Sequence, residues 1–473
     1  MHMNSKRRPT SLSRGWRWIA IVCLIGSLWV TPISSTAAGK ESQTFQISTA
    51  NNTAGSNPSV LTLRQAISDA LHANPGILAN KKDIQASLEE VTASKGALYG
   101  EMDAAMTYQH LNDPQLLRPL SGPITPAAMS TMPFAQDQLH VGVTYTYPLY
   151  VGGKLQTRIK IARLGEDQAR ELLTGTSTDV IYNVTALYVQ CQALSGDADA
   201  IQQEIEELSV TRKDIALGVK VGKRPEVDLL KVDDRISEAQ ANLVNVRAQQ
   251  KRLMEAMFAV MGRSVKTYPS LEPLPSSLPE LPSDESELLA FAQQRSSIKI
   301  ASLQVSQAKE RISLAQAEID PTVALQASYF QHIDASIMDR TKETWFVGMA
   351  INFPLIDGGL RRAELSKSKE QEKAAQERLE SVKLQTDVDL QNAITSWQAA
   401  LEQIKASNSQ FVAAHEVTRI EQLRYDTGAG DIEDLLRART REVAADSAQI
   451  NAKALAILSE AQINRVTEKE IVR

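Results

Sequence analysis

Two kinds of hydrophobic periodicity run along this chain, and the first has a period of two. Apolar residues alternate with small or polar ones in residues 102–109, 139–147, 323–329 and 345–353, with Phe346 as an exception. A period of two is typical of β-strands whose two faces differ. Each segment is close to the ~9 to 11 residues that a tilted strand needs to cross a bilayer. A soluble, half-buried pair of hairpins would alternate in the same way.

The second periodicity is helical. Residues 154–220 contain no proline and few glycines, which predicts one helix about 100 Å long at ~1.5 Å per residue. In a later segment, apolar residues follow the spacing of a coiled-coil seam, and Asn408 fills one gap; they are Leu390, Ile394, Trp397, Leu401, Ile404 and Phe411. Asn408 either fixes the register of that seam or faces water. Shorter helical segments are predicted over residues 61–99 and 285–319.

The chain repeats itself once. Tyr147–Gly153, which ends in a Pro…Gly-Gly turn, recurs 206 positions later as Phe353–Gly359. Val221–Leu230 recurs at the same offset as Thr427–Leu436. Two separate matches in one register indicate two versions of one unit. We therefore divide the chain into a first repeat (helix, two strands, long helices), a proline-rich linker and a second repeat, at residues 61–268, 269–284 and 285–473.

The four predicted strands form two pairs, each joined by a loop. The longer loop is predicted over the proline-containing residues 112–138, and the shorter one over residues 332–343. Open sheet edges are not tolerated in lipid, and small membrane barrels start at about eight strands. If these strands span a membrane, the chain must therefore pool them with copies of itself, and three copies would give twelve.

Residues 1–38 have the features of a secretory signal. Basic residues precede an apolar stretch over residues 18–30, and small residues follow at 34–38. The apolar stretch is short for a spanning helix, which disfavours the alternative of an uncleaved anchor. Removing the segment takes five basic residues from a chain of net charge −5. The predicted mature chain is therefore acidic and exported, and it begins with an N-terminal extension over residues 39–60.

Composition excludes several classes of function. A net negative charge argues against nucleic acid as a partner, and two cysteines with six scattered histidines argue against a disulfide scaffold or a metal site. The mean hydropathy of −0.23 argues against a helical membrane bundle. Neither a catalytic constellation nor a glycine-rich phosphate loop is present in the sequence. We therefore predict a protein that is not an enzyme and needs no cofactor.

With these patterns in place, the chain resembles the TolC family of outer-membrane efflux channels over about residues 61 to 468. The resemblance rests on the run from Leu61 to Pro75, the two Pro…Gly-Gly turns, and Tyr425–Gly428 followed by Asp434-Leu435-Leu436. It implies a mainly α fold with a small β part. Long coiled-coil hairpins would form an α-barrel tunnel, and four strands per chain would contribute to a twelve-stranded transmembrane barrel in a homotrimer.

The resemblance also implies a function and partners. The protein would be the exit duct of a tripartite efflux pump or a type I secretion system in the outer membrane of a Gram-negative bacterium, and would extend into the periplasm. It would contact outer-membrane lipid, a periplasmic adaptor (membrane fusion) protein and an inner-membrane transporter. The alternative that the patterns leave open is a periplasmic helical adaptor or scaffold with soluble β-hairpins.

Three groups of residues are the candidates for function. The helix tips that would contact the adaptor are Gly222, Lys223, Arg224, Gly428, Ala429 and Gly430. The turns between barrel and tunnel would be Pro148, Gly152, Gly153, Pro354, Gly358 and Gly359. The residues expected at the periplasmic aperture are Asp228, Asp434, Tyr425 and Arg437.

The aperture residues carry two open questions. Asp228 and Asp434 are expected in the first turn of the two returning helices, where they either favour the helix dipole or line the tunnel entrance, and both roles can coexist. Tyr425 matches a tyrosine that helps to close the family's entrance. The basic partner expected five residues later is absent, since that position is Gly430. Arg224 or Arg437 is expected to substitute for it.

Overall fold

The computed structural model describes residues 60–120, 125, 129, 132–264, 268–273, 284–340 and 343–469. All of them fall within one unit, Pro58–Arg473. The predicted signal over residues 1–38 lies outside the described residues. The same holds for the N-terminal extension before Val60 and for much of the predicted linker.

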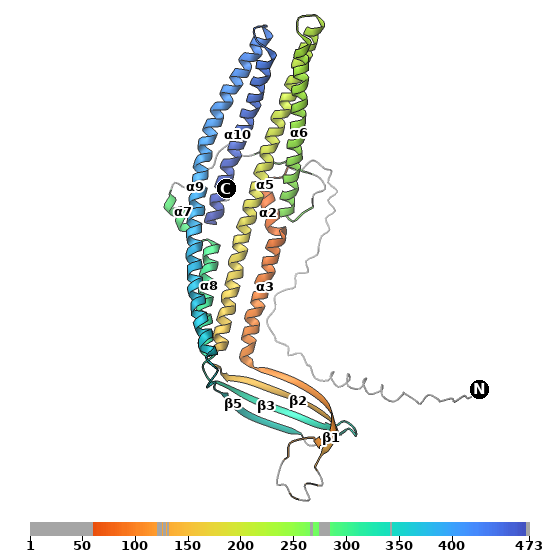
Figure 1. The fold of residues 1–473 in the computed structure, drawn as a ribbon, viewed down its shortest axis with the longest axis vertical. Coiled ribbons are helices and arrows are strands. Elements are labelled where there is room, and N and C mark those ends of the chain that lie inside the picture. Colours follow the sequence, from red (N-terminus) through yellow and green to blue (C-terminus); the bar gives the residue numbers. More distant parts are fainter. Residues whose placement is uncertain are drawn as a thin grey trace, which may run out of the picture. The chain divides into compact units, whose positions relative to one another are not determined.

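The first half of the described chain runs through short helices, two strands and two long helices (Figure 1). The elements are α2 (Leu63–Ala73), α3 (Pro75–Gly96), the 3-10 helix η1 (Ala97–Tyr99), β1 (Glu101–Leu116), β2 (Phe134–Tyr150), α5 (Lys154–Lys220) and α6 (Glu226–Val260). The helix predicted over residues 154–220 is confirmed as α5. The segment predicted over residues 61–99 is two helices, because Asn74 caps α3 through its side chain and Pro75 begins that helix.

The second half repeats this order. Its elements are α7 (Glu285–Ala292), α8 (Ser296–Ala317), β3 (Thr322–Asp334), β4 (Asp339–Arg340), β5 (Thr344–Asn352), α9 (Leu360–Asp426) and α10 (Ile432–Thr467). The helices α5 and α9 hold corresponding places, and each is 67 residues long. The segment predicted over residues 285–319 is again two helices, α7 and α8.

The strands form one antiparallel sheet in the order β1–β2–β3–β5, and the short β4 pairs with the end of β3. The register of the sheet places the alternating residues of the four strands on its two faces. Ala104, Val143, Tyr329 and Trp345 form one row across the four strands. The neighbouring row, on the opposite face, is Asp103, Thr144, Ser328 and Phe346. In this second row, the Thr144 and Ser328 hydroxyls form a 3.1 Å hydrogen bond.

The predicted loops were too long. The strand β1 continues to Leu116, and β2 begins at Phe134, so the connection is shorter than residues 112–138. Backbone pairing persists there although the side chains stop alternating. The ladder shifts its register between His110 and Gln115, around Pro114, because proline cannot donate to it. The strand β3 likewise extends two residues past His332.

The helices α9 and α10 pack through a stripe of small and aliphatic side chains. The seam residues Leu390 and Ile404 are buried, as predicted, and so are the small residues Ala393, Ala400 and Ser407 of the same helix. Ile394 and Trp397 are partly buried and pack against the cluster that contains Leu390. Small residues at the centre let the two helix backbones approach closely.

Asn408 belongs to this interface. Its side-chain oxygen accepts a 2.7 Å hydrogen bond from the Gln449 amide on α10. The polar side chain in the seam therefore pairs across the two helices, which supports the interpretation that it fixes their register.

Among the residues that the structure describes, no helix has both the length and the apolar composition needed to cross a membrane.

Candidate functional site at the helix tips

Each long helix ends in the same glycine turn. Gly222 follows α5 with φ 70°, and Gly428 follows α9 with φ 76°, so both adopt the left-handed conformation. After α5, the Lys223 N–H donates to the Gly218 carbonyl at 2.9 Å, and after α9 the Ala429 N–H donates to the Arg424 carbonyl at 2.8 Å. This six-to-one bond is the Schellman motif, which satisfies carbonyls that a helix end leaves unpaired. The repeat in the sequence is thus a repeat of one chain reversal.

The returning helices begin differently. Pro225 is the N-cap of α6 and not its first helical residue, so α6 has no side-chain cap. Asp431 caps α10 by accepting a hydrogen bond from the Glu433 N–H at 3.2 Å. Asp434 makes no reciprocal bond to this cap among the interactions of the described residues. The N-terminus of α10 therefore has a single aspartate cap.

The two tips share one hydrophobic core. This tip core consists of Ile215 on α5, Val232 on α6, Tyr425 on α9, and Ile432 and Leu435 on α10. All five side chains are buried. The hairpins α5/α6 and α9/α10 are therefore packed against each other at their tips, and the candidate residues of both halves lie around one cluster.

Arg224 connects the two hairpins. Its guanidinium lies 4.0 Å from the centre of the Tyr425 ring, and its Nη2 donates to the Tyr425 carbonyl at 2.7 Å. A cation over an aromatic face and a charged hydrogen bond are both favourable, and more so where water is excluded. Of the two substitutes that the sequence left open for Gly430, Arg224 is the one that contacts Tyr425.

Arg437 has other partners. Its Nη2 donates to Glu433 at 2.9 Å, and its Nη1 lies 3.8 Å from the Asp434 carboxylate. Both contacts are within α10 and exposed to solvent. Exposed pairs of this kind contribute about 0 to 1 kcal/mol.

The two candidate aspartates differ in environment. Asp228 is 8% exposed, whereas the Asp434 side chain is 50% exposed. Burial, reinforced by the negative charge of Asp431, raises the pKa of Asp228, while Arg224 and Lys231 act in the opposite direction. Positions that are equivalent in the repeat are thus electrostatically unequal.

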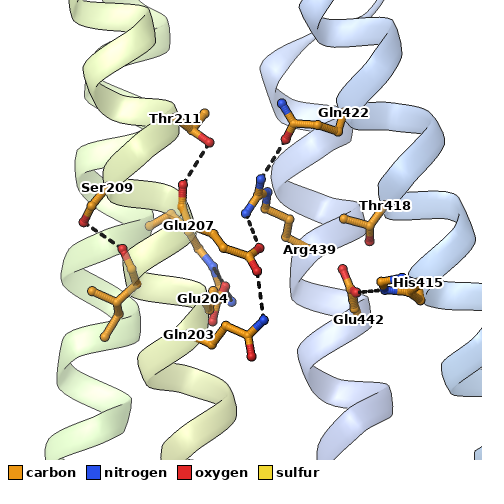
Figure 2. A network of polar contacts seen from close by, with 12 residues as sticks. Gln203, Glu204, Glu207, Ser209, Thr211, His415, Thr418, Gln422, Arg439 and Glu442 are labelled. Atoms are coloured by element: carbon orange, nitrogen blue, oxygen red, sulfur yellow. Dashed lines mark hydrogen bonds and ion pairs between the residues drawn. The ribbon is translucent and has the colours of Figure 1, made fainter.

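A polar network lies next to the tip core, and Figure 2 shows Arg439 at its centre. Arg439 on α10 is 9% exposed; it donates to Glu207 on α5 at 2.6 Å and to Gln422 on α9 at 2.7 Å. This side chain therefore ties the two hairpins together. Arg439 was not among the residues predicted from the sequence, although its position four residues after Leu435 puts an arginine on an otherwise apolar helix face.

The turns between the sheet and the long helices are also a matched pair. Gly153 and Gly359 are the N-caps of α5 and α9, and both have positive φ, as do Gly152 and Gly358 before them. A side chain on Gly152 would meet the Asp320 side chain at 2.9 Å. In the second turn, Asp357 accepts bonds from the Gly359 and Arg361 N–H groups. These turns redirect the chain from a strand into a helix.

One face of the sheet is apolar and exposed. Trp345 is 71% exposed, Met102 70% and Ile351 65%. The same face carries further exposed side chains, namely Met106, Tyr108, Val141, Val143, Tyr329, Val347 and Met349. We call this surface the apolar face. Continuous exposed apolar area on this scale marks a surface that meets lipid or another protein.

A duplicated chain that joins an apolar-faced sheet to long helical hairpins has the architecture of an outer-membrane efflux channel subunit. The family model described as outer membrane efflux protein matches residues 66–263 and 290–467. The chain therefore belongs to the outer membrane efflux protein family.

Individual relatives with low sequence identity support this family assignment. The outer membrane efflux protein BepC of Brucella suis is 24% identical over 322 residues, which are 66% of this chain and 68% of BepC. The Campylobacter jejuni outer membrane channel CmeC has a TM-score of 0.74 at 14% identity, covering 86% of this chain and 85% of CmeC. The Vibrio cholerae outer membrane protein VceC has a TM-score of 0.70 at 16% identity, covering 86% and 95%. These two structures establish the similarity of fold.

Proposed function

We propose that the protein is the exit duct of a tripartite efflux pump or a type I secretion system, and that it conducts substrates passively across the periplasm and the outer membrane of a Gram-negative bacterium. The apolar face is the observation that carries this proposal. A sheet that shows rows of exposed Met, Val, Ile and Trp on one side and Thr, Ser and His on the other fits between lipid and water. A periplasmic scaffold would have to cover that face.

The edges of the sheet support a trimer. Within the described residues, β1 has a neighbour only on the β2 side, and β5 has one only on the β3 side. Open edges are not tolerated in lipid, so each edge requires a strand from another copy. Three copies give twelve strands with no open edge, and the long helices would continue from this barrel as a tunnel.

The test is fractionation of the native protein from outer membranes, followed by electrophoresis with and without heating. We expect a trimer that is stable without heating and dissociates on boiling, because closed barrels resist unfolding. Recovery in the soluble periplasmic fraction as a monomer would favour the scaffold alternative.

We also propose that the tips dock to a periplasmic adaptor protein, which links the duct to an inner-membrane transporter. Lys223 and Ala429 lie at the reversal points of the two hairpins, and both are exposed. A photo-crosslinker at either position should capture the adaptor in cells. A matched crosslinker at Glu402, which is exposed in the middle of α9, should not. Equal capture from all three positions would contradict docking at the tips.

A further inference from the structure

Two histidines on neighbouring strands face each other, and the function proposed above gives them no role. His140 on β2 and His332 on β3 are register partners, and their Nδ1 atoms lie 2.7 Å apart. The rings meet edge to face, with centroids 4.9 Å apart. Because side chains alternate along a strand, both point away from the apolar face, on the side of Thr144 and Ser328.

The hydrogen bonds around the pair determine where its protons are. The Gln138 amide nitrogen donates to the Gln115 carbonyl at 2.8 Å and to the Ala135 carbonyl at 3.0 Å. The other side-chain atom of Gln138, its oxygen, faces Nε2 of His140 at 3.3 Å. An amide oxygen only accepts, so Nε2 of His140 carries the hydrogen, and the Nδ1 of a neutral ring is an acceptor.

The assignment of donors and acceptors extends to His332. Its Nδ1 must donate to Nδ1 of His140, so Nε2 of a neutral His332 is an acceptor. That nitrogen lies 2.7 Å from the Thr344 hydroxyl, which donates to it. When both rings are neutral, a single directional chain therefore runs from β5 through both imidazoles to Gln138 and β1.

This arrangement has room for one proton. Nε2 of His332 is the one basic nitrogen of the pair that does not face the other ring. When a proton binds there, the Thr344 hydroxyl rotates from donor to acceptor, and every bond in the chain is kept. A second proton would have to enter at Nδ1 of His140. It would break the bond between the rings and place two cations within hydrogen-bond distance.

The charged groups around the pair are of both signs. The Arg118 guanidinium, from the segment after β1, acts on His332 electrostatically. The ionisable side chains at neighbouring strand positions are Asp334 on β3, Asp339 on β4 and Glu343 before β5. The Asp334 carboxylate accepts bonds from the Ser336 N–H and hydroxyl. Asp137 and His110 pair with each other on the opposite side of the sheet.

We propose that His140 and His332 form a one-proton site on the luminal wall of the channel, near the loop end of the barrel. In acid each subunit gains one positive charge there, and the hydrogen bonds between its strands are kept. This proposal rests on the function proposed above, which makes that face of the sheet the lumen. The wall would therefore respond to the acidity outside the cell.

The direct test is the ¹⁵N spectrum of histidine-labelled, purified full-length trimer. At neutral pH we expect His140 as the Nε2–H tautomer and His332 as the Nδ1–H tautomer. On acidification one proton should enter per pair, and His140 should stay neutral. Titration of both rings, or the same tautomer for both, would overturn the proposal. Thr344→Ser should preserve this behaviour because it keeps the hydroxyl, whereas Thr344→Val should alter the titration of His332.

The functional test is the reversal potential of single channels in a salt gradient, at about pH 7.5 and about pH 5 on the loop side, on either side of the imidazole range. Acid should shift the preference of the wild-type channel toward anions. The shift should be lost in His140→Gln/His332→Gln and kept in His110→Gln, which changes the histidine on the apolar face. A shift that survives in the double variant would overturn the proposal. Failure of the wild type to form any channel would contradict the proposed function instead.

Discussion

At the scale of single residues, the tips show that residues far apart in the sequence can form one contact. Arg224 is 201 positions from Tyr425, yet it covers the Tyr425 ring and bonds to its carbonyl. The expected position for a basic partner, Gly430, instead lies in the turn itself, where its N–H bonds to the Arg424 carbonyl at 3.0 Å. A charge that joins the two hairpins is thus supplied by the opposite hairpin.

Replacing Arg224 should loosen the tips. The Arg224→Gln variant loses the cation–π contact and the charged hydrogen bond, which together stabilise by about 1 to 3 kcal/mol. We expect amide hydrogen exchange in residues 215–232 and 420–435 to rise about 5- to 140-fold, since ~1.4 kcal/mol corresponds to a factor of ten. Lys223→Gln is the control, because Lys223 is exposed beside it. Equal exchange in both variants would mean that Arg224 does not join the hairpins.

The buried Asp228 predicts a dependence on pH at the tips. Its pKa is raised in the folded state, mainly by burial. As the pH falls through that raised value, the folded tip takes up a proton before the unfolded chain does, so acid stabilises the tip until the pH reaches the unfolded pKa near 3.8. Asp228→Asn should remove this gain, which hydrogen exchange at the tips across that range would measure. Asp434→Asn, at the exposed equivalent, should leave it in place.

At the scale of elements, the same two solutions are used in both halves. Both long helices begin after a left-handed Gly-Gly turn and end in a Schellman motif. The strands need no such matching in length, because β1 and β2 exceed β3 and β5 while the shared register is kept. Substitutions at the helical reversals and on the strand faces therefore test these features.

A charge on the apolar face of β2 should lower the yield of trimer, whereas a charge on the polar face should not. Val143 is on the apolar face, and Thr144 is on the polar one. In a barrel, Val143→Arg would put a charge in lipid at ~2 to 4 kcal/mol, whereas Thr144→Arg would face water. We expect a lower yield of heat-sensitive trimer for Val143→Arg alone. Equal yields would contradict the proposed membrane face.

The glycine reversals should tolerate no branched side chain. A side chain at Gly222 or Gly428 would meet nothing within 4 Å, so the conflict is purely one of the backbone, which has positive φ. That conformation costs a β-branched residue roughly 1 to 3 kcal/mol. The double variant Gly222→Val/Gly428→Val should reach the membrane but impair export, as measured by substrate resistance or secretion. Unaltered export would show that the shape of the tips is not required.

At the scale of the whole molecule, the trimer would bring three copies of each tip together. Asp228 and Asp434 would then place six carboxylates around the entrance, and the exposed Asp434 would contribute more than the buried Asp228. Concentrated carboxylates attract multivalent cations.

Single-channel recordings of the trimer should therefore show cation preference and block by a trivalent cation from the tip side. The variant Asp228→Asn/Asp434→Asn keeps the size of both side chains and should fold and insert normally, while losing the block. If the blocking affinity stays the same, the two aspartates serve only their helix ends.

Local periodicity was enough to predict the kinds of elements and their order. The period-two segments became β1, β2, β3 and β5, and the proline-free run became α5, because these periods are set by the geometry of each element alone. The two glycine reversals were predictable for the same reason, since a left-handed residue leaves a mark in the sequence. The polar, non-alternating ends of β1 and β2 were missed, because backbone pairing there does not depend on the side chains.

Tertiary packing decided which side chains meet. The Asn408 bond to Gln449, the bridge from Arg439 to Glu207 and the contact of His140 with His332 each join residues that neither period relates. The same holds for the burial of Asp228 and the exposure of Asp434, whose sequence surroundings are alike. Hydrophobic patterning specifies a face of each helix and strand, but the partner on that face depends on how the elements pack, and burial and charge follow from that packing.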